Sequence, residues 1–158
     1  ATDKVVVADA NGVLKTKDAS AVAASAEPWY NVATNTGATA NTQDIYQMGK
    51  VGIETMAPNS TLQVSGSMSA AIKSVGTYTA TASDYTLIAT GGAITLPNPA
   101  TCEGRMYHIV YKSGTVTITN AIFVGGTSVT DYGLHSGAGG QAVTLQSDGS
   151  SWYAISRL

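Results

Sequence analysis

The stretch QAVTLQSDGSSWYAIS, residues 141–156, shows the pattern that decides the fold. Val143 and Leu145 alternate with polar residues, which is typical of a strand with one buried and one solvated face. A second strand-like run follows Asp148 and Gly149, a pair that favours a turn because glycine readily adopts a positive φ. The stretch therefore predicts two strands joined by a short turn.

The same alternation of short strands and turn signals extends over residues 67–158. The expected strands are 71–80, 85–89, 93–96, 105–111, 115–119, 121–124, 128–132, 141–146 and 151–156. Strands spaced by about 8–12 residues are typical of a β-sandwich or barrel. We therefore expect residues 67–158 to form a β-rich knob domain. Of its neighbouring rings Trp152 and Tyr153, we expect Trp152 to pack in the core and Tyr153 to face outward.

The composition agrees with a β-rich fold and narrows the function classes. The chain holds 21 Thr, 15 Ser and 17 Gly, and only 11% of its residues are charged, against roughly 25% in an average globular chain. Threonine suits a pleated surface and glycine suits turns. The net charge of −2 is scattered and forms no basic patch, so no nucleic-acid partner is expected. No apolar run of about 18 residues occurs, so no membrane insertion is expected.

Residues 1–66 lack the apolar content of an independent core. A hairpin is expected over residues 4–16, because Asn11 and Gly12 favour the positive φ angles of a tight turn. An isolated hairpin is only marginally stable in water. We therefore expect this hairpin to pair with something else.

Residues 19–43 form a low-complexity stretch rich in Ala, Ser, Asn and Thr. Its first part, residues 19–26, fits either a short helix capped by Asp18 or a flexible Ala/Ser linker. Residues 44–66 contain only short strand-like runs. Because these pieces cannot bury a core of their own, we expect them to pair with copies of themselves from other chains.

A resemblance to a known class of fibre protein rests on several stretches. VGIETMAPNSTLQVSG, residues 51–66, resembles the VGIGT-x-P-x-x-x-L-x-V-x-G motif of phage tail fibres and Bacteroidetes-type surface fibres. Residues 3–14, 29–35 and 44–49 resemble segments of such proteins, and residues 94–97, 104–107 and 145–155 are similar to phage knob domains. Glu54 replaces the second glycine of the motif. If that glycine is needed for a positive φ, Glu54 must be accommodated differently.

The resemblance implies a homotrimer in which residues 1–66 form an intertwined shaft and residues 67–158 a trimeric knob. It implies a structural and attachment protein of a viral tail fibre or appendage, located in the virion or at the cell surface. The implied partners are copies of the chain, other tail or filament proteins, and a bacterial surface glycan or protein receptor. A bacterial cell-surface or secreted filament subunit with an assembly role is the alternative.

No residue pattern indicates an enzyme. The chain lacks H-E-x-x-H, C-x-x-C, Gly-x-Ser-x-Gly and P-loop spacings, so no catalytic residue, metal or cofactor is expected. A dyad of Cys102 and His108 is conceivable, but no signature surrounds it, and His108 is expected to be a sheet residue. A polysaccharide depolymerase, the enzymatic alternative, would need two carboxylates about 5–10 Å apart. The acidic residues of the knob are sparse: Asp84, Glu103, Asp131 and Asp148.

The candidate receptor-binding residues are Asp131, Tyr132 and His135. They fall in the longest polar loop expected in the knob, residues 131–140, and binding residues often lie on loops held by a rigid scaffold. A ring near a carboxylate and an imidazole is suited to stacking on a sugar and hydrogen-bonding it. Two alternatives stay open: Tyr132 only closes a sheet edge, or residues 67–158 act alone as a monomeric carbohydrate-binding module.

Overall fold

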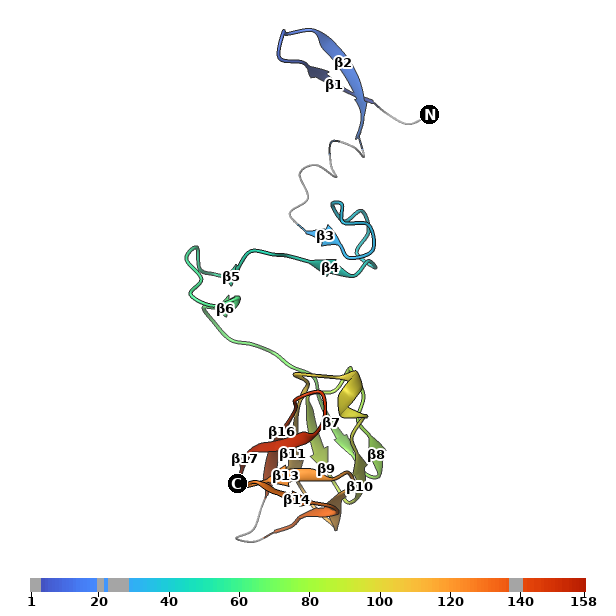
Figure 1. The fold of residues 1–158 in the computed structure, drawn as a ribbon, viewed down its shortest axis with the longest axis vertical. Helices are drawn as coiled ribbons and strands as arrows, with labels where there is room; N and C mark the ends of the chain where they lie inside the picture. The colour runs from blue at the N-terminus through green and yellow to red at the C-terminus, as the bar shows by residue number, and fades with distance from the viewer. Residues whose placement is uncertain (1–3, 20–21, 23–28, 137–140) are drawn as a thin grey trace. The chain divides into compact units, whose positions relative to one another are not determined.

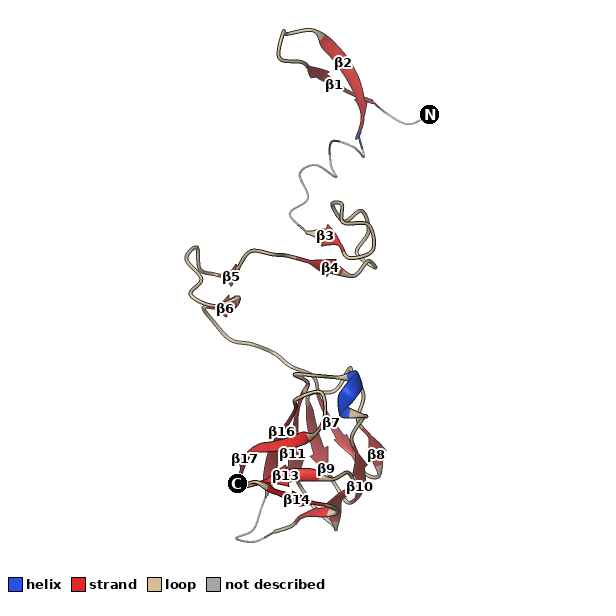
Figure 2. Ribbon diagram, in the orientation of Figure 1, coloured by secondary structure: helices blue, strands red, loops and turns tan. Residues whose placement is uncertain are grey.

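The computed structural model describes residues 4–19, 22, 29–136 and 141–158 of the chain (Figure 1). Strands make up 45% of it and helix 3%, so the prediction of an all-β protein is confirmed (Figure 2). The chain divides into two units, Ala1–Met68 and Ser69–Leu158, and each unit is described by itself.

The first unit begins with the predicted hairpin, made of β1 (Lys4–Ala8) and the antiparallel β2 (Leu14–Asp18). Asp9 closes its turn, because Asp9 Oδ1 accepts hydrogen bonds from two backbone N–H groups of the turn at 2.9 and 3.0 Å. The carboxylate also lies 2.9 Å from Lys15 Nζ. Of residues 19–26, for which the sequence left a helix and a linker open, only 19 and 22 are among the described residues.

The polar stretch that follows is an ordered loop between β3 (Tyr30–Asn31) and β4 (Ile45–Tyr46), which pair antiparallel. The Asn31 side chain, 7% exposed, accepts a backbone hydrogen bond of 2.7 Å from two residues further on. Gln43 Oε1 accepts two more from the backbone N–H groups four and three residues before it, at 2.8 and 3.2 Å. Amide side chains bonded to the backbone therefore order this loop without an apolar core.

The motif-like segment forms a parallel pair of three-residue strands, β5 (Val51–Ile53) and β6 (Leu62–Val64). Gly52 is required here, because a Cβ at this position would lie 2.3 Å from the carbonyl oxygen of Thr55. Glu54 has a φ of 56°, so it adopts the left-handed backbone that favours glycine. Glu54 therefore has the backbone conformation that a glycine would favour at this position.

The second unit consists of two sheets. The described strands are β7 (Ile72–Val75), β8 (Tyr78–Thr79), β9 (Thr86–Ala89), β10 (Gly92–Thr95), β11 (Met106–Tyr111), β12 (Val116–Ile118), β13 (Ile122–Val124), β14 (Thr127–Val129), β15 (Tyr132–Leu134), β16 (Ala142–Ser147) and β17 (Trp152–Arg157). One sheet has the order β14-β13-β17-β16-β11-β9-β7 and the other β15-β12-β10-β8. A short 3-10 helix, η1 (Pro99–Thr101), is capped by the Asn98 side chain.

From β7 to β12 the chain winds between the two sheets. β7, β9 and β11 pair in parallel in one sheet, and β8, β10 and β12 pair in parallel in the other. The run expected as one strand, 71–80, is therefore two strands in different sheets. The corner at Gly92 is tight, because a Cβ there would lie 2.4 Å from Thr77 Oγ1, and its φ is 83°. β15 and β16 then pair antiparallel with β12 and β11.

One hydrophobic core lies between the sheets of the second unit. Its largest fully buried side chains are Trp152, Tyr107, Leu87, Ile94, Ile109, Ile118, Ile122, Leu134, Leu145, Val116 and Val143. Trp152 is 1% exposed and packs against Tyr107, with ring centroids 5.4 Å apart and planes tilted by 35°. Tyr153 is 37% exposed, which confirms the expected alternation of these neighbouring rings.

Candidate functional site

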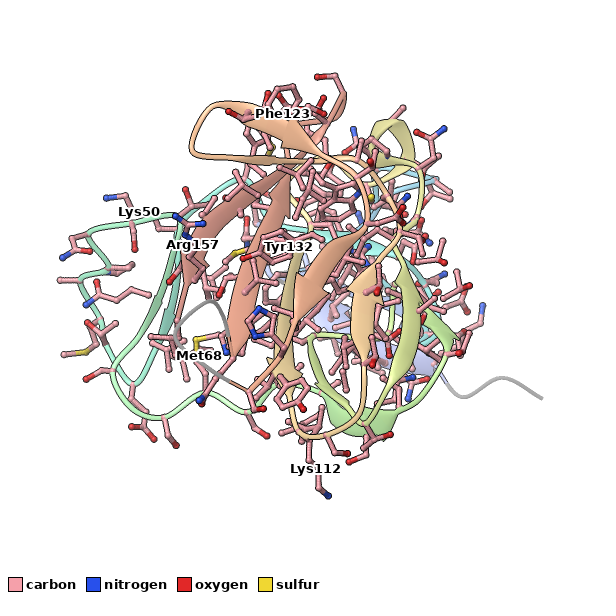
Figure 3. All side chains as sticks on the ribbon, turned by 90° about the horizontal axis from the view of Figure 1, so that it is seen from below. Lys50, Met68, Lys112, Phe123, Tyr132 and Arg157 are labelled. Atoms are coloured by element: carbon pink, nitrogen blue, oxygen red, sulfur yellow. The ribbon has the colours of Figure 1, made fainter. Side chains whose placement is uncertain are left out.

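The predicted receptor-binding residues lie around β15. Asp131, with a φ of 54°, is in the turn before this strand, and His135 follows the strand; both are exposed. Tyr132 packs against the core, and its hydroxyl is buried without a hydrogen-bond partner in the described part of the chain (Figure 3). The expectation of one continuous loop over residues 131–140 is wrong, because Tyr132 and Leu134 alternate into the core and pair with β12.

The conceivable nucleophilic dyad is engaged with other neighbours. His108 Nδ1 lies 2.7 Å from Thr144 Oγ1, across the β11–β16 pair. Cys102 Sγ lies 3.4 Å from the carbonyl oxygen of Asn98. Among the described residues, no group of three or more His, Cys, Asp and Glu side chains is arranged to hold a metal ion.

Two aspartates in turns of the second unit accept hydrogen bonds from backbone N–H groups. Asp148 Oδ1 accepts hydrogen bonds from the backbone of Ser150 and Ser151 at 2.8 and 2.7 Å, and these bonds lower the pKa of Asp148 to about 2. Asp84 Oδ2 accepts one from Thr81 at 2.7 Å. Asp84 also forms an ion pair with Lys73 that the sequence did not indicate.

A depression of about 260 Å³ lies over the β16–β17 hairpin. We call it the Tyr153 depression; its lining residues are Gln146, Ser147, Asp148, Tyr153 and Ile155. Tyr153 stands on the outer face of the seven-stranded sheet, since its neighbour Trp152 points into the core. The depression therefore combines an exposed aromatic ring with a carboxamide and a carboxylate.

Phe123 of β13 backs the ring of Tyr153. The two rings are stacked, with centroids 5.1 Å apart and planes at 18°. Because β17 lies between β13 and β16, Phe123 covers the face of the Tyr153 ring toward β13 and leaves the other toward the depression, which Gln146 of β16 also lines. The strand register places five outward residues in one row: Ser128, Phe123, Tyr153, Gln146 and Met106.

This aromatic pair was missed in the sequence, although one signal pointed to it. The alternation of Trp152 and Tyr153 indicated that one ring would be exposed. The neighbour could not be found, because Phe123 reaches Tyr153 through a parallel pairing of β13 with β17, and strands far apart in the sequence give no local sign of such a pairing.

The first unit holds most of the large hydrophobic side chains that are exposed in the described part of the chain. Twelve of these exposed side chains lie in the first unit and five in the second. The described residues of the first unit include no buried hydrophobic side chain. Ile53 of β5 and Leu62 of β6 are about half exposed, and Met56 between them is fully exposed. These side chains form an apolar surface that the unit itself does not cover.

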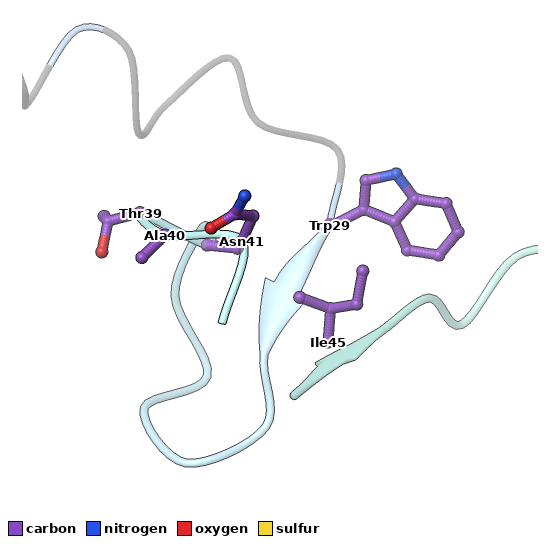
Figure 4. A pocket seen from close by; sticks show the side chains of 6 residues that line it. Trp29, Thr39, Ala40, Asn41 and Ile45 are labelled. Atoms are coloured by element: carbon purple, nitrogen blue, oxygen red, sulfur yellow. The ribbon is translucent and has the colours of Figure 1, made fainter. Parts of the chain in front are cut away.

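A second hollow lies in the first unit beside Trp29 (Figure 4). Its volume is about 340 Å³, and Trp29, Ala38, Thr39, Ala40, Asn41 and Ile45 line it. The Trp29 indole and the Ile45 side chain lie next to each other in Figure 4, so one wall is apolar.

No protein-family model, curated protein or solved structure matches this chain. Among the described residues, no helix is long and apolar enough to cross a membrane.

Proposed function

We propose that this chain is a structural and attachment protein of a viral tail fibre or a similar appendage. In this proposal the first unit joins copies of the chain into a homotrimeric shaft. The second unit is the knob that binds a receptor on a bacterial surface. The proposed location is the virion or the outside of a cell, and other fibre proteins are proposed partners.

The observation that carries the proposal is the apolar surface of the first unit. A large exposed apolar patch marks an interaction site in a folded protein. The parallel pair β5–β6 makes the argument stronger, because parallel strands occur almost only where both faces are covered. Each of the two strands has only three residues, and Ile53 and Leu62 are exposed. The first unit therefore leaves this pair of strands to be covered by other chains.

Copies of the same chain are the simplest cover for this surface. Three chains around one axis bury apolar side chains that a single chain leaves in water, which replaces the missing core. A fibre also needs a rigid distal domain that presents loops to its receptor. The second unit, with its continuous core, meets that need.

The mass of the full-length chain in solution tests the proposal. We expect multi-angle light scattering at micromolar concentration to give the mass of a trimer. Ile53→Asp should reduce the mass toward that of one chain, because it places a charge on the apolar surface. Ile155→Asp is the matched control, since Ile155 is 51% exposed and Ile53 49%; it should leave the mass unchanged. A single-chain mass for the unmodified protein contradicts the proposal.

A further inference from the structure

We propose that the Tyr153 depression binds one neutral sugar ring, stacked on the open face of Tyr153. This inference rests on the attachment role proposed above, and it names the ligand class and the place of contact. It differs from the residues singled out in the sequence, because the Tyr132 ring packs against the core.

The orientation of the Tyr153 ring is set before a ligand arrives. Phe123 stacks on one face of the ring, with the centroids 5.1 Å apart, and the Asp148 carboxylate near the hydroxyl raises the pKa of Tyr153. A side chain held in its binding orientation loses little conformational entropy when a ligand binds. The remaining face is a flat apolar surface, which matches the C–H face of a pyranose.

Polar groups border this ring where the hydroxyls of a stacked sugar would lie. Gln146, opposite Tyr153 in the strand register, offers a carboxamide that both donates and accepts hydrogen bonds. Asp148 is fixed by its turn through Oδ1, and a carboxylate has acceptor sites on both oxygens. Sugar hydroxyls donate and accept, so they can satisfy both groups, whereas a purely apolar ligand cannot.

The charge around the depression and its volume narrow the class of ligand further. Asp148 is ionised at neutral pH. Glu103 lies beside the same turn, since a Cβ at Gly149 would be 3.4 Å from its side chain. Carboxylates at the rim disfavour phosphates, sulfates and acidic sugars. The volume of about 260 Å³ is below the roughly 300–1,000 Å³ of sites for drug-sized ligands, which suits a single ring.

Saturation-transfer NMR on the full-length protein tests the inference. The probes are glucose, galactose and N-acetylglucosamine at millimolar concentration, with glucuronic acid as the anionic comparison. We expect saturation of the C–H protons on one face of at least one neutral sugar, and at least tenfold less for glucuronic acid. Tyr153→Thr should abolish the signal, and Tyr153→Phe, which keeps the ring, should weaken it by less than fivefold.

Tyr85→Thr is the control variant, because Tyr85 is similarly exposed, at 41% against 37% for Tyr153, and does not line the depression. It should bind the sugars as the unmodified protein does. The inference is overturned if none of the neutral sugars gives a signal, or if the signal survives in Tyr153→Thr. It is also overturned if Tyr153→Thr lowers the mass of the protein, since the surface is then a contact between copies.

The two proposals fail separately. A trimer that binds no sugar at Tyr153 leaves the fibre proposal standing and removes this one. A single-chain protein that binds sugar through Tyr153 leaves the sugar-binding inference standing and removes the fibre proposal. Light scattering on the NMR sample distinguishes the two cases.

Discussion

Lys73 Nζ lies 2.6 Å from Asp84 Oδ1, and the Asp84 side chain is 1% exposed while that of Lys73 is 43% exposed. Lys73 belongs to β7, and Asp84 precedes β9, so the pair ties an edge strand to its neighbour. The ammonium group also lies over the Tyr78 ring, 4.4 Å from its centroid. Burial by itself would raise the pKa of Asp84, but hydrogen bonds from Lys73 and Thr81 outweigh it and hold the pKa below its ordinary value.

Asp84→Ala should destabilise the second unit by about 2–3 kcal/mol, because it removes charge-assisted hydrogen bonds and leaves a backbone N–H of Thr81 without its acceptor. Urea unfolding followed by near-UV circular dichroism measures this change. Asp131→Ala, at an exposed turn position, is the control and should cost much less. Equal stability of Asp84→Ala and the unmodified protein would mean that the buried carboxylate and its ion pair contribute nothing.

The stability of the second unit should fall in acid. The folded-state pKa of Asp84 is lowered, so its contribution is complete above the unfolded pKa of about 3.9 and is lost as the pH falls through the folded value. Thermal unfolding at pH 7, 5, 4, 3 and 2 should show the largest loss below about pH 4. Asp84→Asn should be less stable at neutral pH and lose less on acidification; a parallel decline in both proteins contradicts this assignment.

Glu54→Gly should stabilise the first unit by about 1 kcal/mol, because a non-glycine residue in the left-handed region costs roughly 1–2 kcal/mol, and the flexible unfolded glycine offsets part of the gain. Hydrogen exchange of the Val51–Ile53 amides reports on this segment. Glu54→Ala is the matched control, since it removes the carboxylate and keeps the strain. If both variants slow exchange equally, the effect comes from the carboxylate and not from the backbone.

Trp152→Phe should destabilise the second unit by about 2–4 kcal/mol, through a cavity and a lost hydrogen bond. Trp152 Nε1 donates to the carbonyl oxygen of Pro97 at 3.0 Å. That bond connects β17 to the segment after β10. Chemical denaturation measures the loss of unfolding free energy in Trp152→Phe. Tyr153→Phe, on the same strand and facing outward, should change the stability by less than 1 kcal/mol.

Much of the second unit could be predicted from local sequence. Alternation marked β16 and β17, and glycine pairs marked several turns, because both signals depend only on neighbouring residues. The separation of β7 from β8 was missed, because residues 71–80 have the pattern of one strand. The chain bends at Gly76 and Thr77, where Thr77 lies close to Gly92, and this contact between distant residues cannot be predicted from local sequence. Parallel pairing was missed for the same reason, since it joins strands with no hairpin between them.

The candidate site was harder to predict than the fold. Tyr132 was expected in a loop. It faces the core because it belongs to a strand that pairs with β12, which lies on another stretch of chain. Phe123 and Tyr153 meet only through the order of the strands in the sheet. In the first unit, the lack of a core was predictable from composition, whereas the ordering of the polar loop by Asn31 and Gln43 depends on backbone positions that composition does not reveal.

The place of β7 has a mechanical consequence. The chain enters the second unit through this strand, which lies at the edge of its sheet and pairs with β9 alone. A pulling force that reaches the unit from the N-terminal side acts on β7 first and loads its parallel hydrogen bonds to β9. The Lys73–Asp84 pair joins β7 to the turn that leads into β9. The strand that takes the tension first is therefore also the one fastened by an ion pair to a buried carboxylate. The resistance of this unit to pulling should decrease when Asp84 is protonated or the pair is removed.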